Sequence, residues 1–264
     1  MNSRNGFLFA ALMVVFIAIF GVSCEKESTN ALQPLPPKIE RKFKYKKCYT
    51  YDYTDTGGYV LSNINTKVYN AKGYILESFD SIYKGNKYQY STAIVYTFFG
   101  SDSLHEAHQT NGNTNFTYYH YFKNKQLNST FIEGTWMYFA YYGDYMVKMV
   151  LPAVPSNPVD EYEYYWDKNG NMSQIINNGS VWQKLEYTNI VNNNNDGEFW
   201  ESGRNSANHP SKTSYFETKT GALRYTIDHD YRVTPDGFVD TCYMTKTFVS
   251  PKSSVAKRKL VYVR

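Results

Sequence analysis

A short turn unit that recurs along the chain constrains the fold more than any other feature. Each copy has an aromatic or apolar residue, a polar stretch, a glycine and then an apolar residue. Polar turn formers start a type I turn and glycine takes the positive φ that closes it, which is typical of a β-hairpin. The flanking residues then face each other across antiparallel strands. The copies are Tyr69–Ile75, Trp166–Met172, Phe216–Leu223 and Val233–Val239.

Alternating aromatic residues predict the first strand of the sheet. This period of two is typical of a strand with one aromatic face, and it places Cys48 on the other face. The composition agrees, because the chain has 27 Tyr, 16 Phe and 4 Trp, and aromatic residues favour strands. Lys47 interrupts the odd-numbered series, which consists of Phe43, Tyr45, Tyr49, Tyr51 and Tyr53.

The remaining segments predict an all-β domain. Trp136–Tyr142 is apolar on both faces, and so is Tyr162–Trp166 apart from Glu163, which requires a second layer or a curled sheet. No stretch has a sustained helical period. We therefore predict a mainly antiparallel meander of hairpins in a curled or two-layered sheet, with little helix. Long loops are expected at Pro152–Asp160 and Asn189–His209. Further strands are predicted at Tyr88–Phe99, Phe116–Phe122, Tyr145–Leu151, Val181–Thr188, Leu223–His229 and Asp240–Val249.

The start of the chain is typical of a secretory signal. An uncharged run, Phe7–Val22, follows the positively charged Arg4 and the amino terminus. As a helix this run reaches about 24 Å, less than the roughly 30 Å hydrocarbon core that a transmembrane anchor must cross. The run therefore predicts export of the chain.

The sequence Gly21-Val22-Ser23-Cys24 resembles the lipobox of bacterial lipoproteins, although the commonest form has Leu where Gly21 stands. The resemblance implies a thioether-linked diacylglycerol on Cys24, removal of residues 1–23 and acylation of the new amino terminus. Two or three acyl chains anchor a protein stably, so it also implies an outer-membrane lipoprotein. Glu25-Lys26-Glu27 resembles tags that send lipoproteins to the cell surface, or is an ordinary linker; the periplasmic face and the cell surface both stay open.

The chain therefore divides into a signal peptide at 1–23, a tether at 24–42 and a single all-β domain at 43–264. The prolines of the tether favour an extended, solvated segment. Removing the signal peptide takes away one charged side chain, Arg4, so the net charge falls from +4 to +3. So balanced a charge, without a concentrated basic face, argues against nucleic acid as a partner.

Two cysteines remain once Cys24 is assigned to lipid. In an oxidising compartment Cys48 and Cys242 could form a disulfide between the first and last strand regions. The alternative is a pair of separate core thiols. Neither has another cysteine or a histidine at ligand spacing, so no metal is predicted.

The turn units, together with Tyr49–Asp52 and Tyr164–Asn171, resemble the Tyr-Asp repeats of bacterial surface and shell proteins. In that family each repeat adds a β-hairpin to a long antiparallel sheet. The resemblance implies an architecture and no activity.

Polar motifs give no coherent catalytic or metal site. Asn192–Glu198 has the glycine of a calcium loop but too few carboxylates. His105 and His108 would share one face of a helix and bind zinc, but the short segment favours a loop. Asp228-His229-Asp230 would alternate between two faces of a strand. No catalytic residue and no cofactor is predicted.

Exposed aromatic residues are the remaining candidates for a binding site. Trp200 lies in polar surroundings and is predicted to form a ligand platform, whereas the other tryptophans are predicted to be core.

The leading hypothesis is a non-catalytic binding or structural module of the envelope. Its partner would be the membrane through the lipid anchor, with a glycan or another envelope protein as a further possibility. The alternative is an envelope glycan hydrolase with paired carboxylates, such as Asp160 with Glu161 or Glu161 with Glu163.

Overall fold

The computed structural model shows an all-β protein whose described residues fall within one compact unit, Leu35–Arg264. It describes residues 43–55, 57–69, 75–99, 104–111, 114–123, 126–132, 134–153, 158–192, 194–195, 206–249 and 254–264. The lipidation site Cys24 and the predicted platform Trp200 lie outside these residues. No helix long and apolar enough to cross a membrane occurs in the described part of the chain.

Eighteen strands are present in the described residues. They are β1 (Phe43–Lys44), β2 (Lys47–Thr54), β3 (Gly58–Tyr69), β4 (Ile75–Lys84), β5 (Lys87–Phe99), β6 (Leu104–Asn111), β7 (Thr114–Lys123), β8 (Gln126–Ile132), β9 (Thr135–Tyr142), β10 (Tyr145–Leu151), β11 (Asp160–Trp166), β12 (Met172–Asn177), β13 (Ser180–Val191), β14 (Asn194–Asn195), β15 (Asn208–Phe216), β16 (Leu223–Val233), β17 (Val239–Phe248) and β18 (Val255–Val263).

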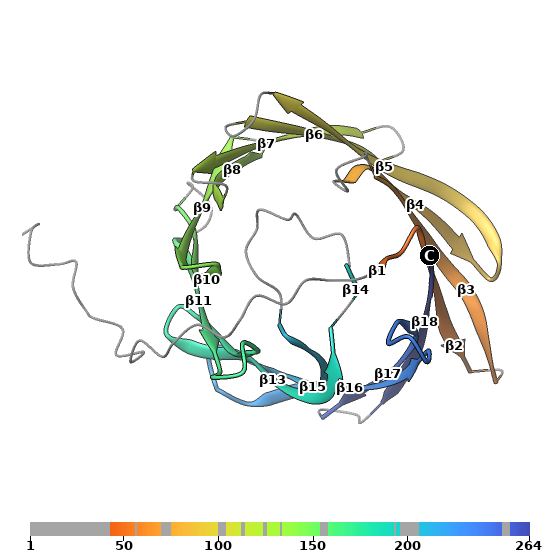
Figure 1. Ribbon diagram of the computed structural model, residues 1–264. Helices are drawn as coiled ribbons and strands as arrows, with labels where there is room; N and C mark the ends of the chain where they lie inside the picture. The colour runs from red at the N-terminus through yellow and green to blue at the C-terminus, as the bar shows by residue number, and fades with distance from the viewer. Residues whose placement is uncertain are drawn as a thin grey trace, which may run out of the picture. The chain divides into compact units, whose positions relative to one another are not determined.

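Sixteen of these strands form a closed antiparallel barrel (Figure 1). Each strand from β2 to β18, apart from β14, pairs with its neighbours along the chain. The last strand then pairs with the first, with Leu260 opposite Thr50 and Tyr262 opposite Cys48. The predicted antiparallel meander is confirmed, and its curling goes as far as closure, which leaves the large sheet without free edges.

The four turn units are hairpin connections, as predicted. β11 ends at Trp166 and β12 begins at Met172, and the other three units separate their strands in the same way. In this turn the Asp167 carboxylate accepts hydrogen bonds from the backbone N–H groups of Asn169 and Asn171, at 2.8 and 2.9 Å. Gly170 has a φ of 80°, a left-handed conformation that glycine adopts at little cost.

Strand register divides the barrel wall into an inner and an outer face. Closure crowds the side chains on the concave face, so the face with most of the buried wall residues is assigned as the inner one; Ser129 and Thr241 are buried on the other face. The buried residues Cys48, Ser78, His120, Thr130, Ile175, Thr213 and Cys242 share one face when register is followed around the ring. The other face carries the exposed Tyr53, Tyr59, Val68, Val95, Tyr138 and Tyr243.

The predicted aromatic strand is confirmed over β2, with one correction. Tyr49, Tyr51 and Tyr53 share the outer face, and Cys48 points the opposite way, as expected. Tyr45 does not continue this series. It precedes β2 and is buried against Cys48, because the Lys46 N–H bonds to the Val263 carbonyl while Lys47 also pairs with Val263, which breaks the alternation of faces before β2.

A small hydrophobic cluster closes the seam between β2 and β18. Its buried members are Tyr45, Cys48 and Phe238, with Leu260 and Tyr262 packed against them. The Tyr45 and Tyr262 rings meet edge to face, with centroids 5.1 Å apart. This cluster joins the first strands to the last.

Cys48 and Cys242 are thiols rather than a disulfide. They lie on β2 and β17, with β18 between them. Two strand spacings amount to about 10 Å, beyond the roughly 7 Å between Cα atoms that a disulfide can bridge. Of the two alternatives left open by the sequence, the structure has the separate buried thiols.

The segment predicted as one long exposed loop, Asn189–His209, is largely ordered at its two ends. β13 runs to Val191 and β15 begins at Asn208, while Asn192 and His209 are buried. The Asn192 N–H donates to the Ala207 carbonyl at 2.8 Å, which closes the neck of the loop. Within it, β14 pairs in parallel with β1, and both fall inside the outline of the ring (Figure 1).

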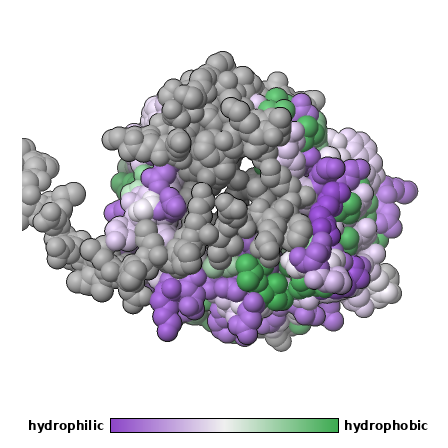
Figure 2. Space-filling model, viewed as in Figure 1, coloured by the Kyte–Doolittle hydropathy of each residue, from purple (hydrophilic) through white to green (hydrophobic). Residues whose placement is uncertain are grey.

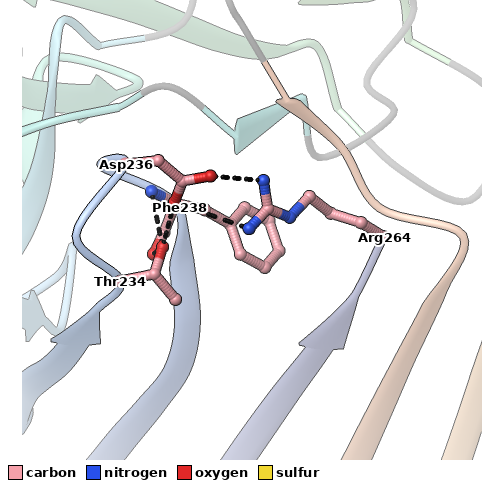
Figure 3. Close-up of polar contacts among 4 residues, drawn as sticks. All are labelled: Thr234, Asp236, Phe238 and Arg264. Atoms are coloured by element: carbon pink, nitrogen blue, oxygen red, sulfur yellow. Dashed lines mark hydrogen bonds and ion pairs between the residues drawn. The ribbon is translucent and has the colours of Figure 1, made fainter.

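The carboxyl-terminal residue fastens β18 to the turn between β16 and β17 (Figure 3). The Arg264 guanidinium donates to the two Asp236 carboxylate oxygens at 2.7 and 3.5 Å and lies 4.5 Å from the centre of the Phe238 ring. Thr234 Oγ1 donates to the same carboxylate at 2.5 Å. These hydrogen bonds lower the pKa of Asp236 from 3.8 to about 2.

This contact predicts an acid-sensitive carboxyl terminus. Because the folded pKa lies below the unfolded one, the stabilisation is complete above about pH 4 and is lost as pH falls through 2. In unfolding experiments at low ionic strength, Asp236→Asn is expected to reduce the loss of stability between pH 4 and pH 2. An unchanged pH dependence in this variant contradicts the assignment. Since the pair is exposed, added salt is expected to weaken the effect.

Candidate ligand site on the inner face

Five aromatic residues form a continuous row on the inner face, at the end of the barrel opposite the Arg264 contact. We call Tyr162, Trp182, Tyr215, Tyr225 and Phe248 the aromatic row. They come from β11, β13, β15, β16 and β17. All five are partly exposed, so part of each side chain is accessible on the inner face.

The ring geometry shows that each residue of the row contacts the next. Tyr162 meets Trp182 edge to face with centroids 5.7 Å apart, and Trp182 meets Tyr215 in the same way at 5.9 Å. Tyr215 and Tyr225 stack at 4.4 Å, and Phe248 follows at 5.6 Å. Such pairs stabilise one another by about 0.5–1.5 kcal/mol each beyond their buried area, which holds the row in place.

Strand register creates this row from residues that are far apart in sequence. Tyr215 stands directly opposite Tyr225, which in turn stands opposite Phe248. Gln183 faces Tyr215 across β13 and β15. A bulge next to Gln183 in the β12–β13 pairing lets the neighbouring Trp182 contact the inner residues Tyr162 and Tyr215.

Polar groups lie along the row. The Lys246 ammonium stands 3.7 Å from the centre of the Tyr225 ring and 4.6 Å from that of Phe248. At the other end of the row, the Tyr162 hydroxyl donates to Asp160 at 2.9 Å. Burial and this hydrogen bond raise the pKa of Tyr162, so its hydroxyl stays protonated. The Gln183 amide donates to the Tyr215 hydroxyl at 3.4 Å.

Two asparagines and an aspartate add a second polar group on the inner face. The side-chain amides of Asn63 and Asn65 on β3 both donate to Asp80 Oδ1 on β4, at 2.9 and 3.1 Å. The amide oxygens of both asparagines are buried without a hydrogen-bond partner in the protein. The inner face therefore has a polar cluster on β3 and β4 in addition to the aromatic row.

The carboxylates considered for hydrolysis do not form a pair on the inner face. Asp160 belongs to the inner face, where the amide of Asn178 donates to it at 3.0 Å. Glu161 and Glu163 lie on the outer face, where Glu161 pairs with Lys148 at 2.7 Å. The Asp160 and Glu161 side chains diverge because they are adjacent in a strand.

Strand geometry also shows that the residues of the two histidine motifs do not come together. His105 and His108 lie in β6, so the segment is neither the predicted loop nor a helix that would bring them together. His229 lies on the inner face near Thr213, at 3.4 Å, whereas Asp228 on the outer face pairs with Lys212. No group of three or more metal-ligating side chains occurs in the part of the chain that the structure describes.

The other tryptophans are distributed between the two faces. Trp166 packs edge to face on Tyr145 and donates to the Met146 carbonyl at 2.9 Å. Trp136 lies on the outer face against Phe131 and Tyr138. Sequence reasoning assigned Trp182 to the core and did not find the row, because strand register alone brings its members together.

Comparison with one solved structure supports the fold, and a second similarity is weaker. A porin-like protein from Bacteroides uniformis has a TM-score of 0.62 at 9% identity, over 83% of this chain and 97% of that one. A porin-like protein from Bacteroides vulgatus has a TM-score of 0.49 at 13% identity, over 84% of this chain and 99% of that one. No family model and no curated protein matches the chain.

Proposed function

We propose that this chain is a lipid-anchored barrel of the outer membrane that binds a ligand on its inner face without catalysis. The observation that carries the proposal is the aromatic row with polar groups beside it. Ligand sites combine apolar and aromatic surface with a few placed polar groups, and the row has this composition. The porin-like fold and the lipobox resemblance of Cys24 support placement in the envelope.

The chemistry of the row favours a carbohydrate. The C–H face of a pyranose ring packs on an aromatic face, while its hydroxyl groups need donors and acceptors at the edge. Lys246 and Gln183 supply donors, and Asp160 supplies an acceptor. A row of five rings suits several consecutive sugar units better than a single one.

Calorimetric titration of the purified protein with soluble pyranose oligosaccharides tests this proposal. At least one oligosaccharide is expected to bind, and Trp182→Ala is expected to weaken its binding about 30-fold, equivalent to about 2 kcal/mol. Trp136→Ala is the matched control, since Trp136 lies on the outer face; it should bind as the unmodified protein does.

Two outcomes contradict the proposal. One is that a broad glycan array and a pull-down from envelope extracts both identify no ligand. The other is that Trp182→Ala and Trp136→Ala weaken binding equally, which would place the site elsewhere.

A further inference from the structure

The outer face of the barrel carries a band of charged side chains near the middle of the strands β10–β16. We call Lys148, Glu161, Glu163, Lys184, Glu186, Lys212 and Asp228 the charged arc. Register places opposite charges face to face, with Lys148 opposite Glu163, and Lys212 opposite both Glu186 and Asp228. Figure 2 shows hydrophilic residues along the lower edge of the molecule, where Figure 1 labels β13, β15 and β16.

The side chains of the arc form ion pairs on the surface and are not covered by the described part of the protein. Lys148 Nζ lies 2.7 Å from Glu161 Oε1, and these side chains are 39% and 34% exposed. Lys212 Nζ lies 3.7 Å from Asp228 Oδ1, with 39% and 54% exposure. Lys184 and Glu186 are exposed as well. Two further lysines, Lys257 and Lys259, extend the charged surface onto β18.

A wall of this kind does not suit a lipid bilayer. A barrel that spans a membrane turns an apolar band towards the lipid around its whole circumference, and lysine near the bilayer centre is strongly destabilising there.

We infer that the outer face of the barrel stands in water, so that the protein is a tethered container rather than a pore across the membrane. This inference goes beyond the proposed function, because a water-exposed barrel offers its inner face to ligands on one side of the membrane and conducts nothing through it. The water-exposed wall rests on the outer face alone, whereas the tether rests on the proposed function; neither depends on which ligand the inner face binds.

Cleavage of the tether in the full-length protein tests the inference. A specific protease site is inserted after Pro37, and membranes carrying the protein are washed and cut without detergent. The barrel is expected in the supernatant after ultracentrifugation. Retention in the membrane pellet until detergent is added would overturn the inference. Protein found in the soluble fraction before cleavage supports a water-exposed barrel and removes the lipid assignment of Cys24.

Labelling of the uncut protein provides a second measurement. In intact membranes, Lys212→Cys is expected to react with a membrane-impermeant maleimide equally fast with and without detergent, provided that the labelled side of the membrane is accessible. Membranes that have been broken open let the reagent reach both sides. The unmodified protein is the control, because its Cys48 and Cys242 are buried. Labelling that requires detergent would place Lys212 against lipid or a partner and overturn the inference.

Discussion

Replacing Leu260 with proline is expected to prevent the barrel from closing. Leu260 lies in the central part of β18, opposite Cys242 on one side and Thr50 on the other. Proline removes a ladder hydrogen bond and is excluded from strands paired on both sides. β18 is the strand that joins β17 to β2. Loss of its pairing therefore leaves two open sheet edges that are prone to aggregation. The yield of monomer on size-exclusion chromatography should fall to near zero.

Val255→Pro is the matched control for this prediction. Val255 is the first residue of β18 and is 59% exposed, and a proline is tolerated at the first position of a strand. Its free energy of unfolding should stay within about 0.5 kcal/mol of the unmodified protein. A monomeric Leu260→Pro variant with unchanged unfolding would show that closure does not depend on this ladder.

Tyr45→Ala is expected to cause the second largest loss of stability, about 3–5 kcal/mol. Tyr45 is only 6% exposed and is a central member of the cluster at the seam. Its hydroxyl accepts a hydrogen bond from the Lys67 ammonium at 2.6 Å, and that ammonium lies 4.4 Å from the ring centre. Against a typical total of about 5–15 kcal/mol, this loss should be evident in urea unfolding.

Tyr45→Phe separates the contribution of the ring to stability from that of the hydroxyl. It keeps the contact with Tyr262 and removes the hydroxyl that accepts the hydrogen bond from Lys67, so a smaller loss of about 0.5–1.5 kcal/mol is expected. Equal losses in the two variants would mean that the hydroxyl, and not the packing of the ring, stabilises the seam. A loss below about 1 kcal/mol for Tyr45→Ala would contradict the role of the cluster.

Energetics explain why the charged wall decides against a lipid environment. A lysine facing lipid at the bilayer midplane costs about 2–4 kcal/mol. Four lysines of the outer face lie near strand centres, so together they would cost about 8–16 kcal/mol, which is comparable with the whole stability of a typical domain. In water the same residues cost little, and Lys148 and Lys212 form ion pairs with Glu161 and Asp228. The four lysines are Lys148, Lys184, Lys212 and Lys259.

Local patterns predicted the strands well because their causes are local. β9 and β10 have the predicted bounds, and the connection between β10 and β11 is the long segment expected from its prolines. The two-sided apolar strands are explained by a wall that has aromatic residues on both faces. The burial of Tyr45 was not predicted, because aromatic residues continue at odd-numbered positions across the break between β1 and β2.

The candidate site could be predicted only in part. The sequence indicated that aromatic residues would provide a binding surface, but it pointed to Trp200, which lies outside the described residues. The row around Trp182 depends on register across β11, β13, β15, β16 and β17, and no local signal specifies register between strands so far apart in the chain.

The sequence by itself determined that this chain is built from antiparallel hairpins, because turn chemistry and a period of two act over a few residues. Only the tertiary structure decided that β18 pairs with β2, which residues face inward, and that charges gather on one side of the outer wall. The physical reason is that closure and register come from pairing between distant strands. One residue of slip would exchange the inner and outer faces of a strand.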